Sequence, residues 1–304
     1  MSRILFKGDA MGFILNQKSL YRYMKRYKLH HITAAAVKYK KFFKIVIFMI
    51  SLVFSLAAQI DESEFLYRIK TNYYSLQSKG IKNFSFWVTS DMFKNNTKEI
   101  FQGKEIYPLE VIWMNPDKLF FIKQPLPVIE DSNDIKLVND LILDLQKELN
   151  GILVDWQRFI GSGLLDKIPE HYLFSTSDDT VKIEFQSIEE NAPATIRLYF
   201  GLNGLCLKIV IENQTTKQIL YTYPGYEYVD KQWLCKNWRV QILDKGEITG
   251  GFLVDIISER IDGYFIPVKI KLHVQSSDKK DKIFFRNYNC RNIMINRDLK
   301  IISK

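Results

Sequence analysis

Few side chains in this sequence are of the types that catalyse reactions or bind metals, and their spacing brings none of them together. Only His171 and His273 lie beyond residue 44. A Ser/His/Asp triad or a metal site needs several convergent partners, and neither histidine lies in a motif that supplies them. The sequence therefore predicts a surface or hydrogen-bonding role for each histidine.

Adjacent acidic residues and one glycine-rich segment also fall short of a catalytic motif. Asp178-Asp179 and Glu189-Glu190 flank a predicted strand, and neighbours in a strand point to opposite faces, which indicates turn acids rather than a general acid/base pair. The segment 161–163, Gly-Ser-Gly, lacks the lysine and Ser/Thr of a phosphate loop and predicts a hinge between a helix and a strand. We therefore expect a protein that is not an enzyme and has no metal and no cofactor.

The cysteines give no sign of redox or zinc chemistry. Cys206, Cys235 and Cys290 form no C-x-x-C pair. An exported chain could close one disulfide among them or keep three buried thiols, and the sequence does not choose between these alternatives.

The positive charge of the chain is concentrated near its beginning. The formal net charge is +9, but residues 1–44 hold 11 Lys/Arg and one acidic residue, Asp9. The remaining residues carry 32 basic and 33 acidic groups. A nucleic-acid-binding protein needs a basic surface on its folded part, so we expect no nucleic-acid partner.

Lys41–Ala58 has the features of an export signal: a basic start, an uncharged stretch and small residues at its end. The uncharged stretch has 14 residues, fewer than the ~20 that a helix needs to cross a bilayer. We expect a cleaved signal peptide and a periplasmic mature protein, with an uncleaved membrane anchor as the alternative. This divides the chain into residues 1–58, a leader and signal peptide, and residues 59–304, a single domain.

The first part of the mature chain alternates helical and strand patterns. Phe65, Ile69, Tyr73 and Leu76 form one apolar stripe, which predicts a helix over residues 61–79. Strands are predicted over residues 83–93, 106–115 and 118–123, where aromatic and branched residues are dense enough to require cover on both faces.

A long helical pattern follows over residues 132–160. Apolar residues recur there at intervals of three and four, with Ser132 or Asn133 as the predicted N-cap. Asn150-Gly151 lies midway, and because glycine costs about 1 kcal/mol in a helix interior, we expect two helices rather than one.

The remainder of the chain shows the two-residue period of half-buried strands. Val181, Ile183 and Phe185 begin this pattern, which recurs around residues 196–200, 205–211, 219–223, 238–242 and 268–274. Turn-forming pairs separate the runs at Asn203-Gly204, Lys245-Gly246 and Asp262-Gly263. We expect an antiparallel meander that continues the sheet of the N-terminal strands.

Apolar side chains of the early strands and of the long helical segment are the remaining candidates for a binding site. They either fill a solid core or enclose a cavity for acyl chains, since ligand pockets are mostly apolar. The candidate ligand-binding residues are Phe84, Phe86, Val88, Val111, Trp113, Leu119, Phe121, Ile142, Leu145, Leu149, Ile152 and Trp156.

Two segments and the order of elements resemble the LolA-like family of outer-membrane lipoprotein carriers and sorting proteins. The segments are Glu110–Phe121, EVIWMNPDKLFF, and Arg260–Leu272, RIDGYFIPVKIKL. The resemblance covers roughly residues 62–299 and departs from a minimal carrier in extra strands between Tyr223 and Gly251. It implies an incomplete β-barrel whose concave side holds lipid, with Leu141–Phe159 as a lid, and it implies no enzymatic activity and no metal.

These arguments predict an α+β, mainly β fold. We expect one strongly curved antiparallel sheet, an incomplete barrel, covered by an N-terminal helix and by the helical insertion at residues 132–160. The expected function is that of a monomeric periplasmic carrier or binding protein for lipid acyl chains or lipoproteins. The alternative is a non-enzymatic structural or interaction module of the cell envelope, with a filled core and envelope proteins as partners.

Overall fold

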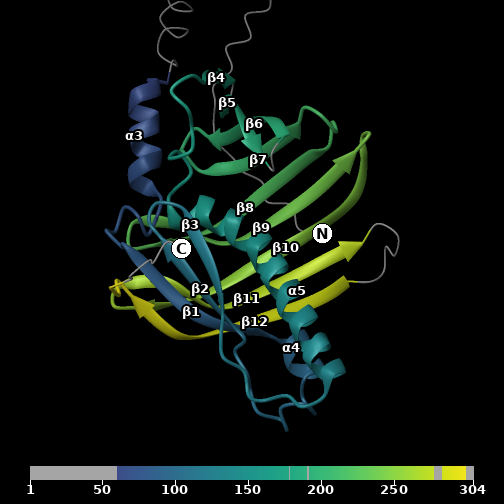
Figure 1. The fold of residues 1–304 in the computed structure, drawn as a ribbon. Helices are drawn as coiled ribbons and strands as arrows, with labels where there is room; N and C mark the ends of the chain where they lie inside the picture. Colours follow the sequence, from purple (N-terminus) through teal and green to yellow (C-terminus); the bar gives the residue numbers. More distant parts are fainter. Residues whose placement is uncertain (1–59, 178, 190–191, 277–282, 299–304) are drawn as a thin grey trace, which may run out of the picture. The chain divides into compact units, whose positions relative to one another are not determined.

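A single antiparallel sheet of twelve strands organises the described part of the chain (Figure 1). The structure is a computed structural model that describes residues 60–177, 179–189, 192–276 and 283–298, all within the unit Ile60–Lys304. The predicted leader and signal peptide lie outside the described residues. No helix among the residues described has both the length and the apolar character to cross a membrane.

The strand order is β3-β2-β1-β12-β11-β10-β9-β8-β7-β6-β5-β4, so strands β3 and β4 end the sheet and it does not close into a barrel. The mainly β, antiparallel prediction is confirmed, as is the pairing of the late meander with the early strands, because β12 pairs with β1. The strands are β1 (Asn83–Ser90), β2 (Leu109–Met114), β3 (Lys118–Lys123), β4 (Leu173–Ser177), β5 (Thr180–Glu189), β6 (Ala192–Gly201), β7 (Cys206–Asn213), β8 (Ile219–Val229), β9 (Gln232–Asp244), β10 (Glu247–Ile261), β11 (Tyr264–Ser276) and β12 (Ile283–Ile295).

The first described helix is α3 (Glu62–Asn72), which is shorter than the predicted segment 61–79. Asp61 caps its N-terminus by accepting a hydrogen bond from the Glu64 amide at 2.8 Å. The prediction is wrong beyond residue 72 because the following backbone pairs with distant segments: the Tyr74 amide donates to the Trp233 carbonyl and the Leu76 amide to the Ile160 carbonyl. Helical periodicity detects the buried side chains there but not these long-range backbone partners.

The early strands are buried unequally. Nearly all residues of β1 and β2 are buried, as predicted, but β3 alternates exposed and half-buried positions. Cover on both faces was therefore wrongly predicted for β3, because it is an edge strand. The predicted strand 83–93 also ends early: the Ser90 hydroxyl accepts from the Phe93 amide at 3.1 Å and begins the short helix α4 (Asp91–Asn96).

Helix α5 (Ser132–Trp156) is continuous and leads into a π-helical turn, η1 (Gln157–Gly161). Its N-cap is Asp131 rather than the predicted Ser132 or Asn133. The predicted break at Asn150-Gly151 is wrong. Leu149, Ile152 and Leu153 are all buried around this point, and burial of such side chains, at about 1.5–3 kcal/mol each, exceeds the cost of one glycine.

Two of the three predicted turn pairs occupy the connections β9–β10 and β10–β11, and Asn203-Gly204 lies between β6 and β7. Lys245 and Gly246 have φ angles of 51° and 84°, and Asp262 and Gly263 have φ angles of 50° and 87°. Two successive positive φ values match the right-handed twist of the flanking strands, which explains why these pairs join them so tightly. The exposed and buried faces of the meander follow from the two-residue sequence period of its strands.

Candidate functional site

The twelve predicted ligand-binding residues all belong to one core between the sheet and helix α5 or pack against it. Ten of them are buried, and Leu119 and Phe121 on the edge strand β3 are half-buried. Phe84, Trp113 and Trp156 contact one another, with ring centroids 5.5 to 6.3 Å apart. Strands β1 and β2 and the end of α5 thus meet in an aromatic cluster, and the ligand-binding role of these residues stays a prediction.

A polar group in the middle of α5 links the helix to strand β12. Glu148 accepts a hydrogen bond from the Tyr288 hydroxyl at 2.7 Å, and its other carboxylate oxygen lies 3.5 Å from Nε of Arg286. Burial, together with Glu148, raises the pKa of Tyr288 well above its ordinary range, so this hydroxyl is a permanent donor. This link is the ionic contact of α5 with the sheet among the described residues. Lys123 on β3 also donates a hydrogen bond to Asn139 of α5, and the buried side of the helix is otherwise apolar.

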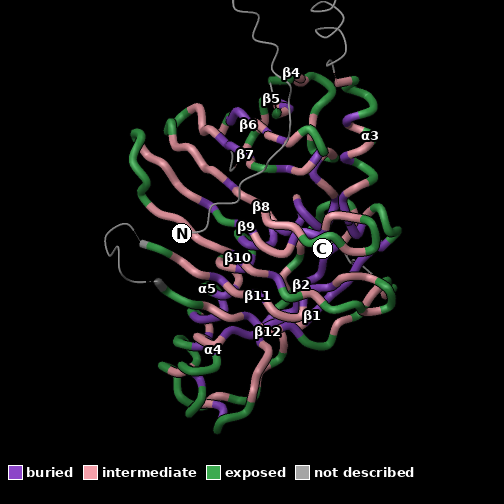
Figure 2. Tube along the Cα trace, turned by 180° about the vertical axis from the view of Figure 1, so that it is seen from behind, coloured by how far each residue is buried: buried purple, intermediate pink, exposed green. Residues whose placement is uncertain are grey.

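Beyond α5, the core face of the sheet continues as apolar side chains that are half-buried or exposed. Five of these residues form what we call the apolar strip: Leu220, Ile242, Phe252, Val274 and Phe284. They lie on one face because they are register partners across neighbouring strands, except that Phe252 pairs with Val240, which is two residues from Ile242 on β9. Phe284 is 46% exposed and the others are half-buried, in keeping with the intermediate colouring of β8–β11 in Figure 2.

Sequence reasoning placed three of these strands correctly but did not single out the apolar strip. Its members carry the ordinary core phase of their strands, and their exposure follows from their distance from α5, which the sequence does not contain.

Two cavities lie away from the twelve predicted residues. One, of about 150 Å³, lies between the end of α3 and the segment after η1. The other, of about 570 Å³, is an open groove beside β5 that His171 and Glu184 line. Neither is lined by a predicted ligand-binding residue.

No protein-family model, no curated protein and no solved structure matches this chain.

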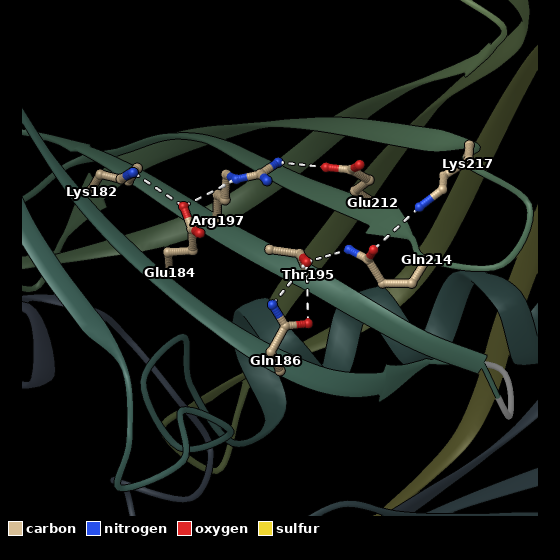
Figure 3. Close-up of polar contacts among 8 residues, drawn as sticks. All are labelled: Lys182, Glu184, Gln186, Thr195, Arg197, Glu212, Gln214 and Lys217. Carbon is tan, nitrogen blue, oxygen red and sulfur yellow. Dashed lines mark hydrogen bonds and ion pairs between the residues drawn. The ribbon is translucent and has the colours of Figure 1, made fainter.

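The outer face of β5, β6 and β7 carries a polar network rather than a reactive group (Figure 3). Glu184 accepts from Lys182 at 3.1 Å and from Arg197 at 3.2 Å, and Arg197 also donates to Glu212 at 3.0 Å. The hydrogen bond from Lys182, assisted by Arg197, holds the pKa of Glu184 below its usual range. These charges neutralise one another across three strands, so the network stabilises the sheet.

The remaining reactive residue types are dispersed or buried. His273 lies 3.6 Å from Asp255 on the neighbouring strand, and its partly exposed ring packs against Phe285, which agrees with the predicted surface role. The described residues contain no cluster of three metal-ligating side chains. All three cysteines are free, buried thiols, and burial raises the pKa of Cys206 to about 12. The predicted acid pairs at 178–179 and 189–190 lie partly outside the described residues.

Proposed function

We propose that the protein is an exported, non-enzymatic binding protein for lipid acyl chains, with the apolar strip as the surface that first receives the ligand. The observation that carries this proposal is the exposure of Phe284 and its neighbours on a face that is otherwise the hydrophobic core. Exposed apolar surface continuous with a core is a common mark of a ligand groove.

The dimensions of the apolar strip suit one acyl chain. It crosses five neighbouring strands, β8 to β12, or four strand spacings of about 4.8 Å, which gives roughly 19 Å. One leaflet of a ~30 Å hydrocarbon core is about 15 Å deep, so a chain of ordinary length fits. Burial of ten methylenes at about 0.8 kcal/mol each would supply about 8 kcal/mol, near a micromolar Kd before ordering costs are subtracted.

Helix α5 would act as a movable cover in this proposal. Its contact with the sheet is mainly apolar, with polar links from Glu148 to Arg286 and Tyr288 and from Lys123 to Asn139. Displacing the helix onto a ligand would therefore exchange mainly one apolar contact for another. Opening of α5 would extend the binding surface from the apolar strip to the predicted residues on β1 and β2, including Phe86 and Val111. The proposed family is that of LolA-like carriers, and the proposed location is the periplasm, with Lys41–Ala58 as the signal.

A pair of adjacent residues on strand β10 tests the proposal. Phe252 lies on the apolar strip, and Leu253 is half-buried on the opposite face of the sheet. Phe252→Ala should weaken binding of a fluorescent C16 fatty acid at least tenfold, whereas Leu253→Ala should leave it unchanged. The proposal fails if the native protein binds no such probe and native mass spectrometry of the exported form finds no co-purified lipid, or if both variants bind equally well.

A second candidate function, an envelope interaction module, is favoured by the edge strand β3. Its outer side chains Phe120 and Ile122 are 37% and 45% exposed, and its free edge can pair with a strand of another protein. Phe120→Lys should abolish capture of an envelope protein but retain binding of the fatty-acid probe. The module is supported over the carrier if the native protein binds no lipid and captures a partner that the Phe120→Lys variant does not capture.

A further inference from the structure

The cavity of about 150 Å³ is built from three chain segments that backbone hydrogen bonds hold together. The Leu76 and Gln77 amides donate to the carbonyls of Ile160 and Gly161 at 2.8 and 3.0 Å, which fixes the segment that follows α3 against the end of η1. Gly163 has a φ of 126°, a conformation open to glycine, and turns the chain so that Asp166 reaches the cavity. The walls are therefore set by backbone geometry rather than by mobile side chains.

Two opposite charges line this cavity without forming an ion pair. Lys70 at the end of α3 and Asp166 after η1 both line the wall. Their charged atoms are farther apart than the 4.0 Å within which the described ion pairs lie. Partial burial raises the pKa of Asp166, and the Lys70 charge partly offsets this effect. A cation and an anion thus face one space from separate segments.

A neutral hydroxyl group of the cavity complements this charge separation. The Ser75 hydroxyl oxygen accepts from the Ser78 amide at 3.1 Å, which leaves its own proton free for donation. The walls therefore offer Lys70 and Ser75 as donors and Asp166 as an acceptor.

We propose that this cavity binds a small zwitterion, a free α-amino acid with a small side chain. The ammonium group would donate to Asp166, and the carboxylate would accept from Lys70 and Ser75. The volume supports this class of ligand, because an engineered cavity of about 150 Å³ in another protein holds benzene, a molecule with about as many non-hydrogen atoms as alanine.

The same features exclude other ligands. An acyl chain is too long for this volume, and a metal ion would find a single carboxylate in the wall. The site is thus independent of the apolar strip.

Titration of isotopically labelled protein with single small molecules tests the proposal. Glycine, L-alanine and L-serine should shift the amide resonances of Ser162 and Gly163 at millimolar concentrations. Propionate and ethylamine each lack one charge of alanine and should bind at least tenfold more weakly, because each leaves one wall charge unsatisfied.

Three variants separate the site from general effects. Lys70→Gln and Asp166→Asn should each weaken alanine binding at least tenfold, whereas Lys167→Gln, next in the chain but not in the wall, should not. All three variants should bind the fatty-acid probe as the native protein does. A failure of the amino-acid inference therefore does not count against the carrier proposal. The inference is overturned if no amino acid shifts these resonances, if propionate binds as well as alanine, or if Lys167→Gln weakens binding equally.

Discussion

Replacing Glu148 by Gln should loosen helix α5 from the sheet without removing any apolar contact. The glutamine carbonyl can still accept the hydrogen bond from Tyr288, so the change removes only the negative charge opposite Arg286. Hydrogen bonds to charged groups contribute about 1.5–3 kcal/mol, and partial exposure of this pair lowers that figure. We expect the closed position of α5 to lose about 1–1.5 kcal/mol relative to an open one.

This loss converts directly into a binding change. If α5 must open to admit a chain, destabilisation of the closed form by about 1.4 kcal/mol raises the open population about tenfold while that population is small. The apparent Kd for the fatty-acid probe should fall by about the same factor. Amides of α5 should also exchange their hydrogens faster with solvent, since local opening controls exchange.

The controls distinguish gating from general destabilisation. Asp144→Asn, on an exposed position of α5 one turn earlier, should change neither the Kd nor the exchange rates. A double-mutant cycle with Tyr288→Phe should give a coupling energy with Glu148, because the two share a 2.7 Å hydrogen bond. The reasoning is refuted if Glu148→Gln lowers the free energy of unfolding but leaves the probe Kd unchanged.

Three further outcomes follow from the described contacts. Trp156→Ala should lower the free energy of unfolding by about 3–5 kcal/mol in urea titrations, because this side chain is fully buried against Phe84 and Trp113; a loss under 1 kcal/mol would contradict the packed cluster. Glu184→Gln should cost about 0.5 kcal/mol at pH 7. Because the pKa of Glu184 is lowered on folding, this cost should disappear as the pH falls through that pKa, and an equal cost at acid pH would argue against the ion pairs. The thiols should resist a thiol reagent in the native protein and react within the dead time in denaturant, since burial raises their pKa; rapid native reaction would show that they are accessible.

The sequence by itself determined the local periodicities and what depends on them. The alternation at Val181, Ile183 and Phe185 and the turn at Asp262-Gly263 predicted the meander, because side-chain direction and turn conformation are properties of a few consecutive residues.

Only the tertiary structure decided where elements end and which surfaces remain open. Helix α3 stops at Asn72 because the next residues pair with Trp233 and Ile160, and α5 runs through Gly151 because the sheet supplies apolar partners on both sides of it. The exposure of Phe284 and the opposed charges of the small cavity depend likewise on distant segments. The physical reason is that propensities amount to about 1 kcal/mol per residue, whereas long-range burial contributes several, so local signals yield wherever the two disagree.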